Sequence, residues 1–235
     1  MANRGILISG IRQLIHKFLC KKSEVKYKKV FLGICKGMYL PIIIGDCVYI
    51  RAYLGVMEYG LVKYFKKYVS KGACCYDIGA AEGYYLCSFH RLSGGGRVYI
   101  FEPDLNWGSV ISKILVLNNI KNAVYIPRFV GNITSSENNS VTIDYLVFQE
   151  KAMPPDVIKV DIDGGEYEFL CGAEKTILTF HPKLIIETHS KEIDEKCQQF
   201  LKKCGYLVTI INQPKFFKEF RPCPLNRWIA AEFCP

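Results

Sequence analysis

The sequence predicts an α/β domain with a doubly wound, mostly parallel seven-stranded sheet, and three observations support this fold class. From about Gly72 onward, short runs rich in Val, Ile and Tyr alternate with longer segments of helical character. Runs such as Leu184-Ile185-Ile186 are continuously apolar, which is typical of parallel strands buried on both faces. A glycine-rich turn follows the first strand, at the place where open α/β sheets bind ligands.

The strands and helices of this domain can be placed from the apolar pattern. Seven strands are expected at residues 74–78, 97–101, 124–129, 157–161, 184–187, 206–211 and 228–232. Four helices are expected at about residues 82–92, 105–117, 166–178 and 193–204. The connections 131–140 and 213–226 are long enough to act as lids or binding elements.

The charge divides the chain into a basic N-terminal segment, residues 1–71, and the predicted α/β domain, residues 72–235. The whole chain has 31 Lys and Arg against 22 Asp and Glu, a formal net charge of +9. Residues 1–71 contain fourteen Lys and Arg and only three Asp and Glu, so the remainder is slightly acidic. Apolar residues recur at helical spacing among the first of these cations, at Leu7, Ile11, Leu14, Ile15 and Phe18.

This pattern predicts a basic amphipathic helix within the first 22 residues. Attachment to an anionic membrane surface and packing of the apolar stripe on the neighbouring domain are equally compatible with it. Binding of nucleic acid is a third, less favoured alternative. No apolar run reaches the roughly 18 residues that a membrane-spanning helix needs, and the eleven cysteines include no Cys-x-x-Cys pair. We therefore expect reduced cysteines in a cytoplasmic protein, with peripheral attachment to a membrane as a second location.

Two glycines and two acids predict a site for a cofactor that contains adenosine. Asp77 ends the first strand, and the turn after it opens the next helix, where backbone N–H groups can face a ligand. Glu102 ends the second strand, where a carboxylate can accept hydrogen bonds from both ribose hydroxyls. The residues expected to hold the cofactor are Asp77, Gly79, Ala80, Gly83, Glu102 and Pro103.

A dinucleotide is the main alternative ligand, because its binding turn lies at the same place and also uses glycines. The full G-x-G-x-x-G pattern is absent, and the carboxylate of Asp77 would repel a diphosphate but not a cationic ligand. S-adenosylmethionine, which carries a sulfonium and an ammonium group, therefore fits the turn better.

Five motifs resemble, in order and spacing, those of the FkbM-type methyltransferases. They are Asp77-Ile-Gly-Ala-Ala-Glu-Gly83, Phe101-Glu-Pro-Asp104, Val141-Thr-Ile-Asp144, Asp156-Val-Ile-Lys-Val-Asp-Ile-Asp-Gly-Gly-Glu166 and Ile186-Glu-Thr-His189. The resemblance covers about residue 72 to the C-terminus. It implies a Rossmann-like class I methyltransferase fold, S-adenosyl-L-methionine as cofactor, and methylation of a hydroxyl oxygen on a sugar or natural product. The family usually has Asn where this chain has Ala81.

Methyl transfer to an alcohol needs a group that removes the hydroxyl proton or a divalent cation that lowers its pKa. Asp161 and Glu187 end neighbouring strands, which lie about 4.8 Å apart, and His189 shares a face with Glu187. We predict that Asp161, Glu187 and His189 surround the acceptor, with one acting as base or all three holding a metal ion. Asp163 and Glu166 fit either this chemistry or a capping box of the following helix.

The sequence as a whole predicts an S-adenosylmethionine-dependent O-methyltransferase whose partner is a small-molecule or glycan acceptor. Two alternatives stay open: an RNA methyltransferase whose basic segment contacts phosphates, and a non-catalytic protein of the same fold at a membrane surface. Asp144, which follows a short strand-like run, is expected to cap the next helix.

Overall fold

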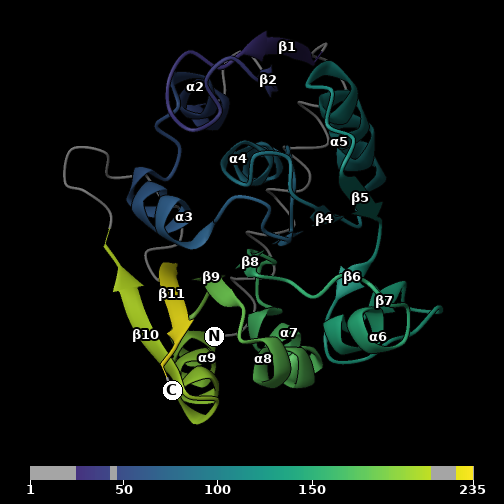
Figure 1. Ribbon diagram of the computed structural model, residues 1–235, viewed down its shortest axis with the longest axis vertical. Helices are drawn as coiled ribbons and strands as arrows, with labels where there is room; N and C mark the ends of the chain where they lie inside the picture. The colour runs from purple at the N-terminus through teal and green to yellow at the C-terminus, as the bar shows by residue number, and fades with distance from the viewer. Residues whose placement is uncertain (1–24, 43–46, 213–225, 235) are drawn as a thin grey trace, which may run out of the picture.

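The computed structural model describes residues 25–42, 47–212 and 226–234, and a seven-stranded sheet forms its centre (Figure 1). The strand order is β10-β11-β9-β8-β3-β4-β5, and within this sheet β11 alone runs antiparallel to its neighbours. The predicted doubly wound, mostly parallel fold is therefore confirmed. The strands are β3 (Cys75–Ile78), β4 (Val98–Phe101), β5 (Ala123–Ile126), β8 (Val157–Val160), β9 (Lys183–Thr188), β10 (Tyr206–Ile211) and β11 (Arg227–Phe233).

Helices cover both faces of the sheet, and each face has its own hydrophobic core. On one face lie η1 (Tyr59–Leu61), α3 (Val62–Tyr68), α4 (Tyr84–Leu92) and α5 (Leu105–Leu117). On the other face lie α6 (Ile143–Phe148), α7 (Glu166–Gly172), α8 (Glu174–Phe180) and α9 (Lys191–Lys203). Neighbouring residues of β3 point to opposite cores, Cys75 to the first and Tyr76 to the second, because strand side chains alternate.

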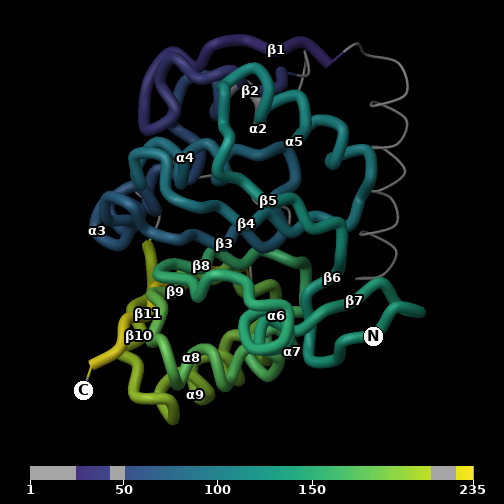
Figure 2. The backbone as a smooth tube through the Cα atoms, turned by 45° about the vertical axis from the view of Figure 1, so that its right-hand side comes forward, coloured from purple at the N-terminus to yellow at the C-terminus, as the bar shows by residue number. Residues whose placement is uncertain are grey.

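The described part of the N-terminal segment packs on the first of these cores. It contains β1 (Lys26–Lys29), β2 (Tyr39–Ile42) and α2 (Cys47–Leu54), which lie together at one end of the molecule in both views (Figures 1 and 2). The Asn118 side chain at the end of α5 accepts a hydrogen bond from the Tyr39 N–H at 2.7 Å and donates one to the Tyr39 carbonyl at 2.9 Å. The domain boundary after residue 71 stays a prediction, and the helix expected within residues 1–22 lies outside the described residues.

Two segments differ from the expected elements. The helix expected at 166–178 is two helices, because the Asp144 carboxylate in α6 accepts the N–H groups of Lys175 at 3.0 Å and Thr176 at 2.7 Å and so begins α8. The expectation that Asp144 caps the next helix is wrong, because Thr142 is the N-cap of α6 and the Asp144 carboxylate caps the more distant α8 instead. The strand expected at 124–129 ends at Ile126, because Pro127 lacks the N–H that a ladder requires. The chain then forms a small parallel pair, β6 (Phe129–Val130) and β7 (Ser140–Val141).

Of the eight cysteines whose side chains the structure describes, all are free and six are buried. Their burial agrees with the expectation of small apolar cysteines in the core. In the part of the chain that the structure describes, no helix has both the length and the apolar character needed to cross a membrane.

Candidate functional site

The turn between β3 and α4 packs directly on the end of β8. Gly79 adopts φ 76°, and a Cβ atom at this position would overlap the carbonyl oxygen of Asp161. Gly83 adopts φ 81° immediately before α4 begins. Between them, Ala81 adopts φ 42°, a left-handed conformation that Asn tolerates better than Ala. Only glycine at position 79 allows this close approach of the turn to the neighbouring strand.

The backbone N–H groups of this turn are used within the protein. Those of Gly79 and Ala80 donate to the Phe101 carbonyl at 3.0 and 3.1 Å, and that of Gly83 donates to the Ala80 carbonyl at 2.8 Å. These three N–H groups are bonded to carbonyls of the protein, so the expectation that N–H groups of the turn face a ligand stays a prediction for its other residues. The glycines shape the turn, and their contact with a cofactor stays a prediction.

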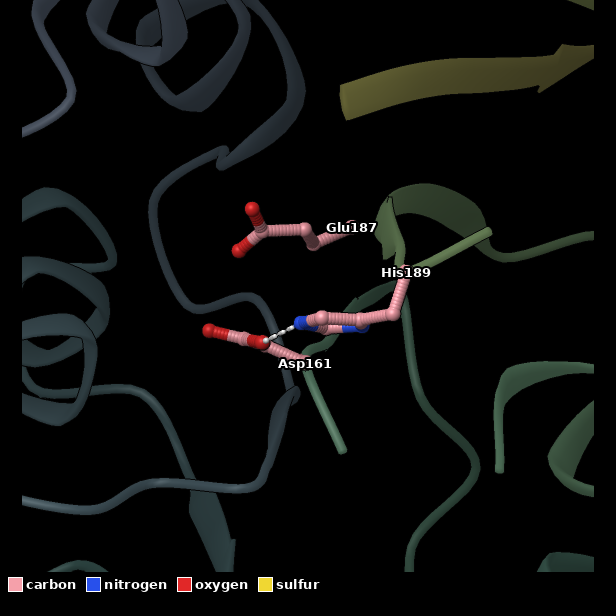
Figure 3. A group of neighbouring side chains, drawn as sticks. All are labelled: Asp161, Glu187 and His189. Carbon is pink, nitrogen blue, oxygen red and sulfur yellow. Dashed lines mark ion pairs between the residues drawn. The ribbon is translucent and has the colours of Figure 1, made fainter. Parts of the chain in front are cut away.

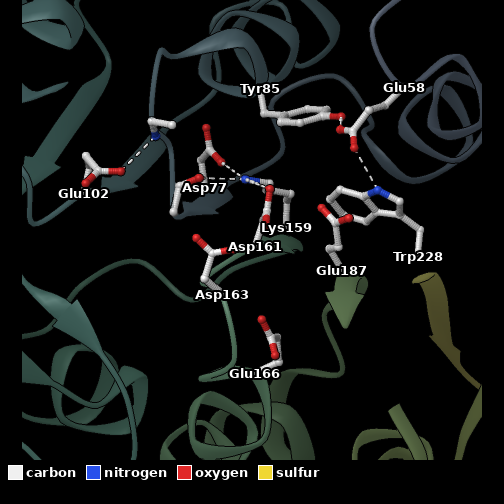
Figure 4. Close-up of polar contacts among 12 residues, drawn as sticks. Glu58, Asp77, Tyr85, Glu102, Lys159, Asp161, Asp163, Glu166, Glu187 and Trp228 are labelled. Carbon is white, nitrogen blue, oxygen red and sulfur yellow. Dashed lines mark hydrogen bonds and ion pairs between the residues drawn. The ribbon is translucent and has the colours of Figure 1, made fainter. Parts of the chain in front are cut away.

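Glu102 stands at the end of β4 beside this turn (Figure 4). One of its carboxylate oxygens accepts the Ala81 N–H at 2.9 Å and the other accepts the Asp104 N–H at 2.9 Å. These two bonds fix the carboxylate, and each oxygen keeps a lone pair that can accept a further hydrogen bond. Pro103, which follows, is half-buried.

Lys159 is a buried cation beneath the turn that the sequence reasoning missed. Its side chain is 2% exposed; Nζ donates to the Gly79 carbonyl at 2.8 Å and lies 3.5 Å from Asp77 and 3.8 Å from Asp161. Burial lowers the pKa of Lys159, but Asp77 and Asp161 outweigh it and raise the pKa above its usual value. The available signal was a lysine inside the apolar strand Val157–Val160, because a buried charge requires partners.

Asp77 lies entirely below the surface, and burial raises the pKa of its carboxyl group, while Lys159 and the Leu86 backbone N–H act in the opposite direction. Its charge is balanced by Lys159. A direct contact between Asp77 and a cofactor therefore stays a prediction.

Asp161, Glu187 and His189 come together at the ends of β8 and β9 (Figure 3). One ligand atom from each lies within 4.8 Å of the other two, and His189 Nε2 is 3.5 Å from Asp161 Oδ1. The two acids arrive from adjacent parallel strands, and the histidine follows Glu187 by two residues. The structure thus places the three predicted residues side by side, while their chemical roles stay predictions.

Glu166 holds the imidazole of His189 in this arrangement. Glu166 is fully buried, and its Oε1 lies 2.7 Å from His189 Nδ1 and accepts the Gly164 N–H at 3.0 Å. The other oxygen, Oε2, has no hydrogen-bond partner among the described residues. Burial lowers the pKa of His189, but the Glu166 hydrogen bond and Asp161 outweigh it and raise the pKa.

The capping box considered for Asp163 and Glu166 is wrong. The helix α7 begins at Glu166 itself, and its N-cap is Gly165, which has no side chain to cap it. Asp163 is instead an exposed residue whose Oδ1 lies 3.1 Å from His189 Nε2. Two glycines follow Asp163, so the chain turns before the helix and brings Glu166 to the imidazole.

The N-terminal segment also contributes a carboxylate that the sequence reasoning missed. Glu58, just before η1, is 8% exposed and accepts hydrogen bonds from Trp228 Nε1 at 2.8 Å and from the Tyr85 hydroxyl (Figure 4). Trp228 is the register partner of Glu187 in the pairing of β11 with β9. Glu58 therefore connects the N-terminal segment to the same edge of the sheet, a link that no local pattern reveals.

Acidic groups outnumber cations in this part of the described structure. Asp77 and Asp161 pair with Lys159, and Glu58 and Glu82 also raise the pKa of this lysine. Such an excess of negative charge favours a positively charged ligand and disfavours a diphosphate.

Ala81→Asn is expected to increase the free energy of unfolding by about 0.5–1 kcal/mol, because Asn relieves the cost of Ala in the left-handed region. Denaturation in urea measures the free energy of unfolding of the wild type and the variant. The matched control is Ala80→Asn, which should destabilise the protein because Ala80 is buried. Equal destabilisation by both substitutions would contradict the left-handed conformation of residue 81.

Glu82→Gln is expected to weaken the pH dependence of stability. Burial raises the pKa of Glu82 to about 7, above its value of about 4.5 in the unfolded chain. The folded state therefore keeps the Glu82 proton up to a higher pH than the unfolded chain does. The stability that this proton provides is lost as the pH rises from about 4.5 to 7. The variant should gain on the order of 1–3 kcal/mol at pH 8 and little at pH 4. Thermal melts of wild type and Glu82→Gln between pH 4 and 8 test this prediction, with the exposed Glu195→Gln as control. Curves of stability against pH that run parallel for Glu82→Gln and the wild type would refute it.

A family model named methyltransferase FkbM domain matches residues 118–208. This segment contains β8 and β9 with Asp161, Glu187 and His189, and it begins after the turn at Gly79. None of the curated proteins matches the chain in sequence.

Three solved structures have a similar fold at low sequence identity. The methyltransferase FkbM from Methylobacillus flagellatus KT gives a TM-score of 0.57 at 18% identity, over 80% of this chain and 55% of its own. An S-adenosylmethionine-dependent O-methyltransferase from Thermotoga maritima gives a TM-score of 0.55 at 11% identity, over 92% of this chain and 80% of its own. A Clostridium thermocellum protein assigned provisionally as an rRNA-methylase gives a TM-score of 0.51 at 17% identity, over 72% of this chain and 91% of its own.

At these identities the structural likeness shows the fold alone, that of the Rossmann-like class I methyltransferases. The family match adds a sequence relation over the strands that carry the acidic cluster. The resemblance of this chain to the FkbM-type methyltransferases is therefore confirmed over residues 118–208.

Proposed function

We propose that the protein is an S-adenosylmethionine-dependent O-methyltransferase that methylates a hydroxyl group of a sugar, glycan or small natural product. The observation that carries this proposal is the direct contact between two groups of residues. The turn at Gly79 packs on the backbone of Asp161, which belongs to the cluster with Glu187 and His189. A cofactor at the turn would thus lie next to side chains able to handle a hydroxyl proton.

The residues at the turn fit S-adenosylmethionine. Glu102 is held by two backbone N–H groups in an orientation that would accept ribose hydroxyls, and its lone pairs are sufficient for both. The surplus of carboxylates over Lys159 suits a ligand with a sulfonium and an ammonium group. When bound, the cofactor supplies an electrophilic methyl group, and the chain must hold the acceptor oxygen in line with it and exclude water.

The cluster of Asp161, Glu187 and His189 fits a divalent cation. Two carboxylates and one imidazole are an established donor set, and their ligand atoms are already within 4.8 Å of one another. Glu166 on His189 Nδ1 leaves Nε2 facing the carboxylates of Asp163 at 3.1 Å and Asp161 at 3.5 Å, and a carboxylate on the other ring nitrogen is how metal-binding histidines are oriented. A bound cation would lower the pKa of the acceptor hydroxyl.

The same geometry also serves proton transfer without a metal. Glu166 fixes the imidazole through Nδ1, so Nε2 of His189 is the atom that would take the hydroxyl proton. Asp161, 3.5 Å from Nε2, would stabilise the imidazolium that forms. The metal and the base are thus alternative roles for one cluster.

RNA methylation is a second candidate, favoured by the basic N-terminal segment and by the likeness to the Clostridium thermocellum protein. It requires RNA affinity that falls steeply with salt. A non-catalytic role at a membrane surface is the remaining alternative, and membrane attachment by residues 1–22 stays a prediction.

Glu102→Ala is expected to weaken S-adenosylmethionine binding about ten- to hundredfold, because charge-assisted hydrogen bonds to the ribose are lost. Calorimetric titration of wild type and variant measures the change, with the exposed Glu137→Ala as control. Unaltered affinity in a folded Glu102→Ala protein would remove Glu102 from the cofactor site. No binding to the wild type would remove the methyltransferase proposal itself.

Asp161→Asn, Glu187→Gln and His189→Ala are each expected to lower Mn²⁺ affinity at least about tenfold, because each removes one of three donors. Electron paramagnetic resonance of free Mn²⁺ measures binding in the presence of S-adenosylmethionine, and the exposed Glu195→Gln is the control. If the wild type binds Mn²⁺ no better than the variants, the metal role is wrong and the base role is left.

A further inference from the structure

Two large apolar side chains are exposed in the loop between β1 and β2. Phe31 is 61% exposed and Leu32 is 49% exposed. A third, Leu54 at the end of α2, is 40% exposed. Single exposed apolar residues are common on protein surfaces, but these three come from two segments in direct contact, since the Phe31 N–H donates to the Tyr53 carbonyl at 2.8 Å. We infer that they share one patch of the kind that marks an interaction site. We call Phe31, Leu32 and Leu54 the apolar tip.

The core holds the other side of the same loop. Val30 and Met38 are 2% and 6% exposed, and the Val30 N–H donates to the Met38 carbonyl at 2.8 Å. Cys35 is fully buried, and its Sγ lies 3.2 Å from Ser88 Oγ in α4. The loop is therefore anchored by three buried side chains while Phe31 and Leu32 remain in water.

Two glycines clamp the loop against the end of α2. Gly33 and Gly55 both have positive φ, 77° and 70°, and a Cβ on Gly55 would overlap the Leu32 carbonyl oxygen. The Phe31 N–H also donates to the Tyr53 carbonyl at 2.8 Å. The tip is thus held in a fixed conformation before any partner binds, which lowers the entropic cost of insertion.

Exposed cations lie on the same strand and loop as the tip. The exposed lysines of β1 and the loop are Lys26, Lys28, Lys29 and Lys36. The exposed Arg91 of α4 donates to the Lys36 carbonyl at 2.8 Å. The sequence has no Asp or Glu between Glu24 and Asp46. An apolar centre with a basic rim matches a membrane surface with anionic headgroups, where apolar side chains reach the acyl boundary and lysines face phosphates. RNA would engage the cations but leave Leu32 and Leu54 in water.

We propose that the apolar tip inserts into the surface of an anionic membrane, with the surrounding lysines facing the lipid headgroups. This goes beyond the proposed methyltransferase function and does not depend on it. It also differs from attachment by residues 1–22, because it rests on residues 26–55.

Co-sedimentation of the full chain with vesicles tests the proposal. The wild type should bind vesicles of about three parts phosphatidylcholine to one part phosphatidylserine, and not pure phosphatidylcholine. The variant Phe31→Ser/Leu32→Ser should bind at least about tenfold more weakly, because two apolar side chains no longer leave water. The matched control is Phe129→Ser/Ile133→Ser, a pair that is 58% and 64% exposed in another part of the fold and should bind like the wild type.

A second readout covers the case in which the double variant fails to fold, which circular dichroism would reveal. Phe31→Trp should show a blue-shifted emission and quenching by brominated lipid when anionic vesicles are added, whereas Phe129→Trp should not. No binding by the wild type, or equal binding by Phe31→Ser/Leu32→Ser, would overturn the proposal. The proposal would also be overturned if Phe31→Ser/Leu32→Ser lost only RNA affinity or only self-association. The tip would then bind RNA or a second copy of the chain.

Discussion

The ammonium group of Lys159 is the interaction on which the candidate site depends. It is buried under the turn between β3 and α4, where it donates to Gly79 and lies within 4 Å of both Asp77 and Asp161. Without this lysine, two carboxylates would share a poorly hydrated region, and an uncompensated buried charge costs about 3–5 kcal/mol. The same cation holds the turn on the end of β8. The residues predicted to hold the cofactor and those predicted to surround the acceptor are therefore linked through one buried cation.

A second constraint is steric and acts at the same place. The turn reaches β8 only because Gly79 has no Cβ, so the backbone of Asp161 lies directly against it. Around this contact, two members of the cluster have separate supports: Glu166 orients His189, and the strand pairing places Glu187 opposite Trp228. Such support keeps side chains in position before a ligand arrives, which is how sites built on rigid elements stabilise a transition state.

The charges of the molecule are separated in space as well as in sequence. The edge of the sheet around Lys159 carries excess carboxylate, whereas the loop at Phe31 and its surroundings carry lysine and arginine. Yet the two parts are not independent, since Cys35 contacts α4 and Glu58 binds Tyr85 and Trp228. The basic surface around Phe31, which favours anions, thus packs on the same core as the acidic region around Lys159, which favours cations.

The sequence by itself determined the sheet, most of its helices and the place of the site, because apolar periodicity and the turn at Gly79 are local signals. It also brought Asp161, Glu187 and His189 together, because neighbouring parallel strands end at the same edge. Only the tertiary structure decided the partners of Lys159, the orientation of His189 by Glu166 and the entry of Glu58 into the site. Asp144 shows the same limit, because its carboxylate caps a helix 31 residues away rather than its own. The physical reason is that such contacts join residues distant in the chain, and their energy depends on burial and distance that exist only after folding.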